Sequence, residues 1–395
     1  MKMKTFLGSL LIGGTALGAG MLALPIATAG GGLIPSWAVY FFSWIFSIAT
    51  GLLFVEIGLW LPKKANIVSM ATTLLGNFGK WFAWGLYIFL FYSLTVAYVA
   101  GGGRLLAIFL GSEFSPSIGI VLFTLIFGVV VYLGTKIAGR VNAILMSGLI
   151  LSYLAFVVFG VDKIDFSHIQ VWGWKGAVMG LPIIFTSFSY QGTVPTLLDY
   201  LGRDGKRTRF AIIAGTTIPF IAYIIWDVII KCVVPIDGAH GLLAARESGQ
   251  TAVEPLKYFL QNSKISIIGN FFAFFALTTS FIGVTLGLLD FLSDSLEFKK
   301  TELNKALLAL AVYIPPVLIA LTNPSIFLDA LGYAGGFGCA LLLGFLPTLM
   351  AWVGRYKKKY PGIHPLLPGG KLVLILLFLF VAFEIGVQLF EQFAQ

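Results

Sequence analysis

Long apolar segments alternate with short polar interruptions along nearly the whole chain. The last of them contains VLILLFLFVAF and is apolar on all sides, which is typical of a helix surrounded by lipid or by other helices. A helix needs about 20 apolar residues to cross the bilayer core. Windows bounded by charge, Pro and Gly predict eleven such helices, at 5–31, 34–60, 81–110, 117–136, 140–160, 174–200, 209–233, 265–291, 304–322, 326–353 and 371–391.

Composition supports a membrane protein and excludes an ordinary soluble domain. Of the 395 residues, 58% are hydrophobic and only 11% are charged, whereas soluble domains carry about 25% charged residues. A membrane β-barrel would show short segments of alternating polarity, and the long apolar segments do not fit that pattern. We therefore predict an all-α membrane protein that forms a single domain over 1–395.

The net charge of +9 indicates an orientation rather than a nucleic-acid partner, because the positive residues lie in short loops. Most of the 26 Lys and Arg residues fall on the side of the N-terminus, with clusters at 203–209 and 355–359. Since positively charged loops remain in the cytoplasm, the N-terminus is expected there and the C-terminus outside. The first apolar segment is expected to be an uncleaved crossing, not a signal peptide.

The longest interruption, at 234–264, is expected to form a partly helical lid on the outer side. Cys232 and Cys339 fall on different predicted helices, and the histidines at 168, 240 and 364 fall in loops. Neither a disulfide framework nor a His/Cys metal cluster is predicted.

A few ionisable residues lie within the predicted helices. Asp227 and Lys231 are four residues apart, which predicts an ion pair on one helix face. Glu56 has two interpretations, a salt bridge at a gate or a side chain that reaches the interface. Arg104 either closes an outer gate or reaches the headgroups, and Glu384 indicates a packing or oligomer contact outside the transport core.

The first predicted helix is interrupted by GGTALGAG at 13–20. Each Gly costs about 1 kcal/mol relative to Ala within a helix, and unsatisfied backbone in lipid is tolerated only where protein or a watery cavity surrounds it. Taken alone, the stretch fits either a broken helix or a close helix contact through Gly14 and Gly18.

The sixth predicted helix has a second interruption, in which Pro182 and Pro195 enclose a polar stretch at 186–193. A kinked helix with hydroxyls bonded to its own carbonyls would also fit this stretch taken alone. Interrupted helices at corresponding positions of two inverted halves, however, are typical of a transporter site.

The two interruptions together predict an inverted repeat with five helices in each half. Repeat one is expected at about 5–160 and repeat two at about 174–353, with one additional helix at 371–391. Broken helices expose N–H groups that suit a carboxylate and C=O groups that suit a cation. An amino acid carried with a coupling ion fits that chemistry.

Four motifs resemble those of the bacterial aromatic amino acid permeases, particularly the tyrosine-specific members. They are, in chain order, GGTALGAGMLALP, FYSLTVAYVAGGG, LPIIFTSFSYQGTVP and ALTTSFIGVTLGLLDFLSD. That family belongs to the amino acid/polyamine/organocation superfamily, with the five-plus-five fold of the bacterial leucine transporter. The resemblance implies ion-coupled uptake of tyrosine, and also of tryptophan or phenylalanine, across a bacterial inner membrane, with no cofactor.

The resemblance also implies site residues. The backbone amides of Ala19 and Gly20 would face the substrate carboxylate, and Gly18 and Gly20 would leave room for its approach. Thr186 and Phe185 would lie beside the amino group and the side chain.

Specificity would be read by three further residues of the sixth helix, Phe188, Tyr190 and Gln191. Many aromatic residues only pack, because 15% of the chain is aromatic. Tyr92 and Tyr98 are about 600° of helical rotation apart, so at most one of them lines the site.

The coupling ion is either sodium or a proton. Several proton-coupled relatives in this superfamily carry a lysine on the fifth helix, and Gly148 lies about where that lysine would fall. ALTTS at 276–280 matches the spacing by which sodium-coupled members bind their ion, and this implies a sodium site formed by Gly14, Leu17, Ala276, Thr279 and Ser280. The alternative is that the hydroxyls bond only to their own helix.

Other classes fit less well. A channel would repeat one filter in both halves, and GGTALGAG and FTSFSYQG are not copies. A membrane-embedded enzyme would show a motif such as GxSxG or HExxH, and neither occurs. A transporter of another neutral amino acid remains an alternative, and the sequence does not indicate the oligomeric state.

Overall fold

The computed structural model describes residues 2–111, 114–165, 173–260, 263–295, 301–360 and 365–394. These residues form helices and connecting loops and contain no β-strand, which confirms the all-α prediction. His240 is stacked on the ring of Tyr258, whereas His168 and His364 lie outside the described residues.

Seven of the predicted helices are continuous and lie close to their expected positions. Their first residues are often capped, as where the Asp204 side chain accepts the Arg207 amide (3.1 Å) before the seventh predicted helix. The seven are α3 (Ile34–Trp60), α5 (Pro116–Tyr132), α6 (Thr135–Gly160), α10 (Gly205–Val233), α13 (Ser263–Ser295), α14 (Glu302–Thr322) and α17 (Gly370–Ala394).

Within the described residues, eight helices are long and apolar enough to cross a membrane, or nine if the bent pair α1 (Lys2–Ala16) and α2 (Ala19–Ala27) forms one span. The α5 helix has only 17 residues, and the sixth predicted segment is divided into short helices. The structure therefore shows a multi-helix architecture, while the total of eleven crossings and the inverted repeat stay predictions.

One helix begins earlier than predicted. The α4 helix (Ile67–Leu110) begins where Asn66 accepts the Ser69 amide (2.8 Å), not at residue 81. It passes a kink at Gly76, whose φ of 74° favours glycine. The expectation of a loop was wrong because 67–80 is amphipathic, with a buried face formed by Ile67, Met70, Ala71 and Leu74.

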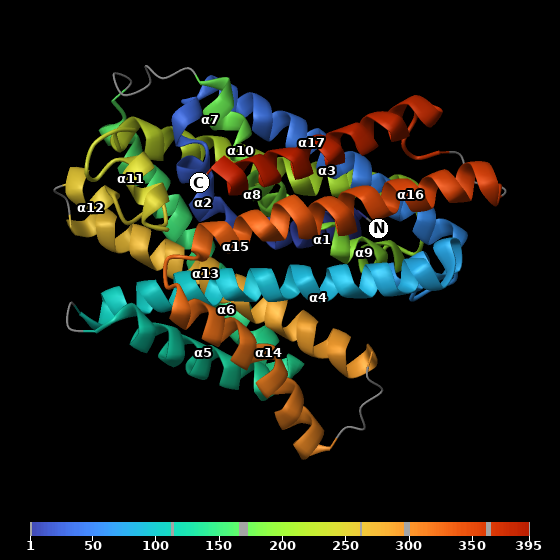
Figure 1. The fold of residues 1–395 in the computed structure, drawn as a ribbon, viewed down its shortest axis with the longest axis horizontal. Helices are drawn as coiled ribbons and strands as arrows, with labels where there is room; N and C mark the ends of the chain where they lie inside the picture. Colours follow the sequence, from blue (N-terminus) through green and yellow to red (C-terminus); the bar gives the residue numbers. More distant parts are fainter. Residues whose placement is uncertain are drawn as a thin grey trace.

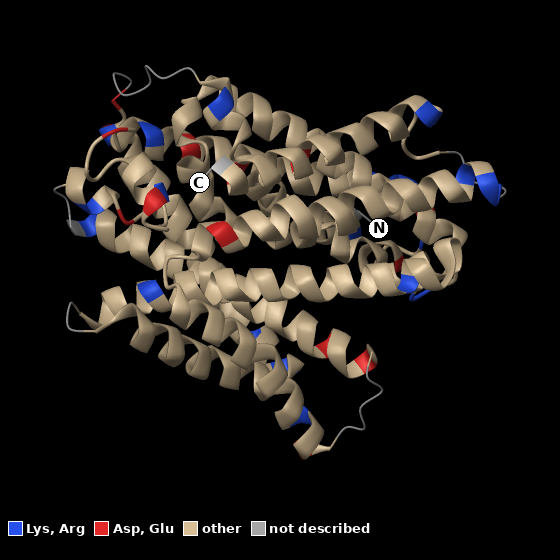
Figure 2. Ribbon diagram, in the orientation of Figure 1, with Lys and Arg blue, Asp and Glu red and all other residues tan. Residues whose placement is uncertain are grey.

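The helices lie side by side along the long axis of the molecule (Figure 1). The α4 helix extends along most of this axis, with α5 and α14 on one side and α3 and α17 on the other. The α13 helix packs against α6 and α4, and α1 packs against α10. Charged residues gather near the two ends of the bundle, and its middle is almost free of them (Figure 2).

The tenth predicted helix is not a regular α-helix. It consists of α15 (Phe327–Tyr333), the π-helical stretch η5 (Ala334–Phe345), α16 (Leu346–Trp352) and a second π-helical stretch, η6 (Val353–Lys357). Single π-helical turns often occur at functional sites. The η5 stretch packs against α8, α4 and α17, so it lies at the centre of the structure.

The predicted outer lid is partly helical, as expected. It contains two short helices, α11 (Leu242–Glu247) and α12 (Leu256–Phe259). The Ala252 amide donates to the Leu22 carbonyl (3.0 Å), so the lid is tied directly to α2.

Candidate functional site

The first predicted break lies between α1 and α2, whose axes are bent by 54°. Gly18 leads into α2, and the Ala19 amide donates to Ser280 Oγ of α13 (3.0 Å). A Cβ atom on Gly18 would lie only 2.5 Å from that oxygen. The glycine therefore permits the close approach of α13. Of the two amides predicted to face a substrate carboxylate, that of Ala19 donates to Ser280 instead.

The second break divides the sixth predicted helix. It follows α7 (Trp174–Val178) and separates α8 (Leu181–Ser187) from η4 (Gln191–Thr193) and α9 (Val194–Tyr200). Pro182 and Pro195 lie in the first turns of α8 and α9. A first-turn amide has no intrahelical acceptor, so proline is well tolerated there. The two prolines thus begin separate helices rather than kink one.

The two breaks meet in the interior. A Cβ atom on Gly20 would lie 2.9 Å from Ser187 Cα, so the backbones of α2 and α8 are in close contact. The buried hydroxyl of Tyr223, on α10, lies 2.5 Å from the Ala16 carbonyl oxygen and 2.8 Å from the Ser187 carbonyl oxygen. Two carbonyls from the two breaks therefore converge on a single hydroxyl group.

Tyr223 was not identified from the sequence. It precedes Asp227 by four residues and Lys231 by eight, so the three share one face of α10. That spacing is the signal that could have identified it.

Polar side chains from several helices gather beside the breaks. Tyr98 of α4 is buried beside Ser280. Thr186 Oγ1 donates to the Leu331 carbonyl of α15 (3.0 Å). Cys339 of η5 lies next to the hydroxyls of Thr186 and Ser189. The tenth predicted helix therefore completes a polar cluster that the motifs had not indicated.

Tyr92 does not belong to this cluster. Its hydroxyl donates to the Ala311 carbonyl of α14 (2.7 Å), on a different face of α4 from Tyr98. This agrees with the helical rotation between the two tyrosines.

The two phenylalanines expected to contact the substrate have different neighbours. Phe185 is buried with its ring centre 5.0 Å from that of Phe46 on α3. Phe188 packs against Tyr223, with ring centres 5.0 Å apart. The structure does not show them facing each other across one pocket, and their roles in binding stay predictions.

Tyr190 and Gln191 face α3. The Tyr190 hydroxyl donates to the Ser47 carbonyl (3.0 Å). Gln191 is buried, accepts the Tyr190 amide (2.9 Å) and donates to Thr50 Oγ1 (3.1 Å). A substrate hydroxyl would have to replace one of these bonds, so the proposed role of Gln191 in selectivity stays a prediction.

The residues of the predicted sodium site are engaged in other contacts. Thr279 Oγ1 donates to the Phe275 carbonyl of its own helix (2.8 Å), and Ser280 accepts the Ala19 amide. Thr279 Oγ1 also lies 3.2 Å from the Ala276 carbonyl. The contacts of Gly14 with Met146 and of the Leu17 amide with the Gly13 carbonyl do not involve the predicted ligands, the Gly14 and Leu17 carbonyls. The sodium site, which includes the Ala276 carbonyl, stays a prediction.

Gly148, where the resemblance implies a lysine in proton-coupled relatives, lies against the ring of Phe275. A Cβ atom there would be 2.8 Å from that ring. A longer side chain at this position would therefore require Phe275 to move.

The predicted ion pair on α10 is present and completely buried. Lys231 Nζ lies 3.0 Å from Asp227 Oδ1 and donates to Thr28 Oγ1 (2.8 Å), the Gly32 carbonyl (2.9 Å) and Ser36 Oγ (2.9 Å). Because Lys231 donates to groups at 28, 32 and 36, it connects α10 with the turn between α2 and α3.

Two other ion pairs connect different helices. Arg104 Nε lies 2.8 Å from Glu254 Oε2 of the lid, so its side chain is paired within the protein, and the gate role stays a prediction. Glu56 forms a two-pronged pair with Arg355, with both N to O distances at 2.7 Å. Glu56 is therefore part of a salt bridge rather than a side chain that reaches the interface.

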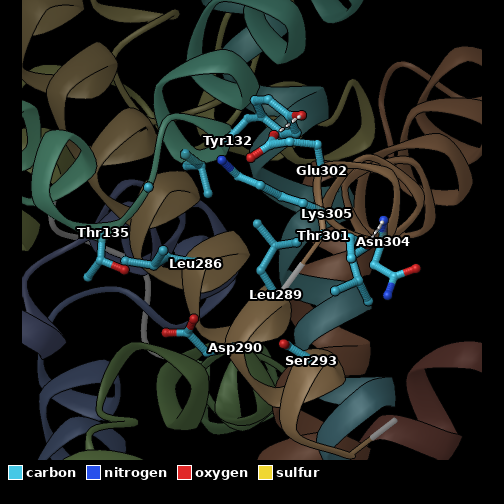
Figure 3. A pocket seen from close by; sticks show the side chains of 13 residues that line it. Tyr132, Thr135, Leu286, Leu289, Asp290, Ser293, Thr301, Glu302, Asn304 and Lys305 are labelled. Carbon is cyan, nitrogen blue, oxygen red and sulfur yellow. Dashed lines mark hydrogen bonds between the residues drawn. The ribbon is translucent and has the colours of Figure 1, made fainter. Parts of the chain in front are cut away.

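A polar cavity of about 300 Å³ lies elsewhere, between α5, α13 and α14 (Figure 3). Within it, Tyr132 donates to Glu302 Oε2 (3.4 Å), and Lys305 Nζ lies 4.4 Å from the centre of the Tyr132 ring. Its lining includes no residue of α1, α2, α8 or α9. The helix breaks therefore remain the candidate site.

Comparison with known proteins gives concordant results. The sequence profile of the tryptophan/tyrosine permease family matches residues 1–388. The chain is 32% identical to tyrosine-specific transport system 1 of Haemophilus influenzae, over 94% of this chain and 93% of that protein. It is 30% identical to the tryptophan-specific transport protein of the same organism, over 97% of this chain and 94% of that protein.

Among solved structures, a manganese transporter of Eremococcus coleocola has a similar fold. The TM-score is 0.61 at 11% identity, over 97% of this chain and 84% of that one. This likeness concerns the fold alone.

Proposed function

Because this chain belongs to the tryptophan/tyrosine permease family, we propose that it is a secondary transporter that imports aromatic amino acids, with tyrosine as its main substrate. Substrate and a coupling cation would move together by alternating access. The protein is a multi-pass membrane protein, and we place it in the bacterial inner membrane with its N-terminus in the cytoplasm.

The observation that supports this proposal most strongly is the meeting of the two broken helices. Three helix ends lie within one buried region: the C-terminal ends of α1 and α8 and the N-terminal end of α2. Tyr223 donates to carbonyls at the ends of α1 and α8. Helix N-termini carry a partial positive charge and C-termini a partial negative charge. A zwitterionic amino acid has the two charged groups that this region complements.

In this proposal the carboxylate binds at the start of α2. The Ala19 amide donates to Ser280. The Gly20 amide lies in the first turn of α2, where the helix itself supplies no acceptor, so it can donate to the carboxylate. The amino group would bind the carbonyls of Ala16 and Ser187. It carries three N–H donors, so it can serve both acceptors, whereas the Tyr223 hydroxyl has one proton for the two.

The aromatic ring would extend toward the polar cluster of Tyr98, Thr186, Ser189 and Cys339. Such a cluster can bond a phenolic hydroxyl, and it could also bond an indole N–H. Relatives named for tyrosine and for tryptophan are nearly equally similar to this chain, so tryptophan is the second candidate substrate.

Counterflow of labelled tyrosine into proteoliposomes loaded with unlabelled tyrosine tests the proposal. We expect saturable exchange that tyrosine, tryptophan and phenylalanine inhibit more strongly than leucine. Equal inhibition by leucine would indicate a general neutral amino acid transporter. A flux that does not saturate would indicate a channel.

A further inference from the structure

Glu384 is a buried acidic residue near the middle of α17. The helix covers Gly370–Ala394, so Glu384 lies two residues, or about 3 Å, beyond its midpoint. Its side chain is 0% exposed, and neither carboxyl oxygen has a hydrogen-bond partner among the described residues. The side chain is buried within its own chain, which agrees with the packing interpretation of this residue.

Within the described residues, the Glu384 carboxyl forms no ion pair. On η5 the neighbouring titratable group is the thiol of Cys339. On α17 the next ionisable residue is Glu391, which is paired with Arg246 of the lid. The other elements packed against α17 are α8 and α16, which carry hydroxyls at Thr186, Ser187 and Thr348. Nearer the lid end of α17, Gln392 donates to the Tyr333 hydroxyl, Lys175 Nζ lies 5.6 Å from the centre of the Phe390 ring, and Asp329 is near Arg246.

A polar stripe runs from Glu384 toward the lid end of α17. Gln388 follows one helical turn later, is buried, and has a side-chain oxygen without a partner among the described residues. Glu391 and Gln392 follow after another turn and contact Arg246 and Tyr333. Residues four apart lie on one helix face, so the stripe connects the buried carboxyl with the water-exposed end of the helix.

On its other side, Glu384 lies near Cys339 of η5, which is also next to Thr186 of the candidate site. A Cβ atom on Gly336 would lie 2.6 Å from Gln388 Cβ, and one on Gly335 would contact the Pro182 carbonyl and Thr186 Oγ1. The π-helical stretch η5 is therefore held tightly between α17 and the broken sixth helix. A change in the packing around Glu384 would be transmitted directly to Thr186.

An isolated carboxylate is strongly disfavoured in such an environment. An ionised acidic side chain at the centre of a membrane helix is costly and normally has a partner, and a buried group without one becomes neutral instead. The packing described here therefore fits the protonated acid. Ionisation requires water or a cation beside the carboxyl, which means that η5 and α17 must move apart.

From this arrangement we propose that Glu384 is the proton-binding group of the transporter, and that its protonation stabilises the tight packing of η5 against the sixth helix. The carboxylate takes up one proton from water along the stripe on one side of the membrane and releases it to water in the opposite conformation. Since each conformation favours one protonation state, proton and substrate movements are linked. The inference rests on the proposed transport function and deepens it.

The test compares Glu384→Gln, which mimics the neutral acid, with Glu384→Asp, which keeps a titratable group. An acid-outside gradient of about one pH unit, without sodium, supports about tenfold accumulation of labelled tyrosine at one proton per substrate. We expect accumulation in the wild type and in Glu384→Asp. Glu384→Gln should equilibrate tyrosine without accumulation, yet still perform counterflow, which needs no net proton movement.

Accumulation by Glu384→Gln at the wild-type level would overturn the proposal. Absence of counterflow in the wild type would instead reject the transport function itself, so the two failures are distinguishable.

A chemical measurement on the wild type does not depend on the variants. Dicyclohexylcarbodiimide reacts preferentially with protonated carboxyl groups in apolar surroundings, and mass spectrometry locates the modified residue. We expect modification of Glu384 at neutral pH and its loss in alkali. An unmodified Glu384 at neutral pH, with other carboxyls labelled, would contradict the proposal.

Discussion

Replacing Gly18 by alanine tests how the first broken helix is held in place. The new Cβ atom would lie 2.5 Å from Ser280 Oγ, while its next neighbour, Ser280 Cβ, would lie at 3.8 Å. The conflict therefore involves a single oxygen atom. Overpacking in a tight interior costs about 1–3 kcal/mol, and we expect Gly18→Ala to lose stability by this amount and to transport poorly.

The same distances predict a rescue. In Gly18→Ala/Ser280→Ala the offending oxygen is gone, and the closest remaining contact is an ordinary 3.8 Å. The double variant should therefore be free of the steric cost of Gly18→Ala. It still loses the hydrogen bond from the Ala19 amide, which costs about 1 kcal/mol of stability. The expected coupling energy between the two substitutions is about 1–3 kcal/mol. It corresponds to a factor of roughly 5–150 in the equilibrium constant for unfolding.

Gly20 supplies a matched control. A Cβ atom there would meet Ser187 Oγ at 2.5 Å and also Ser187 Cα at 2.9 Å. Truncation of the serine cannot remove its Cα atom, so Ser187→Ala should rescue Gly20→Ala far less.

Both sets of variants would be compared by thermal unfolding in detergent and by tyrosine counterflow. Unfolding reports packing even if Ser280 also binds an ion. A Gly18/Ser280 double variant as unstable as Gly18→Ala alone would refute the steric reasoning, as would equal rescue at both glycines.

Three further predictions concern the buried polar groups. Asp227→Ala leaves the charge of Lys231 unpaired, so it should lower the free energy of unfolding by about 3–5 kcal/mol. In thermal unfolding, the double variant Asp227→Leu/Lys231→Met should recover most of this stability. An unchanged melting temperature in Asp227→Ala would contradict the ion-pair argument. If the substrate hydroxyl replaces a bond of Gln191, Gln191→Ala should reduce the preference for tyrosine over phenylalanine in competition assays; an unchanged preference would place that hydroxyl at the cluster of Tyr98, Thr186, Ser189 and Cys339 instead. Thr279→Ala/Ser280→Ala should abolish uptake driven by a sodium gradient alone if these hydroxyls bind sodium; equal uptake without sodium, unaffected by both substitutions, would reject the sodium site.

Local chemistry explains the features that could be predicted from the sequence. The glycines at 13–20 and the prolines at 182 and 195 predict breaks because these residues weaken or begin helices wherever they occur. The pair Asp227 and Lys231 could be predicted because four residues make about one helical turn. The start of α4 was missed because charged and polar residues on one face of 67–80 resemble a loop when the buried face is not considered.

The residues that complete the candidate site could not be predicted in this way. Cys339 has no unusual local sequence, and the spacing of Tyr223 from Asp227 and Lys231 indicates only a shared helix face. Both residues reach the breaks because η5 and α10 pack there. Gln191 illustrates the opposite case, since its sequence position indicates a binding residue while the structure shows its polar groups bonded to α3.

The sequence by itself determined the properties that depend on near neighbours along the chain: the membrane class, most helix bounds, the two breaks and the family. The tertiary structure alone decided which side chains meet, because such contacts depend on how helices far apart in sequence are packed. Glu384 shows the difference most clearly. From the sequence it is an acidic residue in an additional helix, and only the packing of α17 against η5 leaves it buried with no hydrogen-bond partner in the described part of the chain.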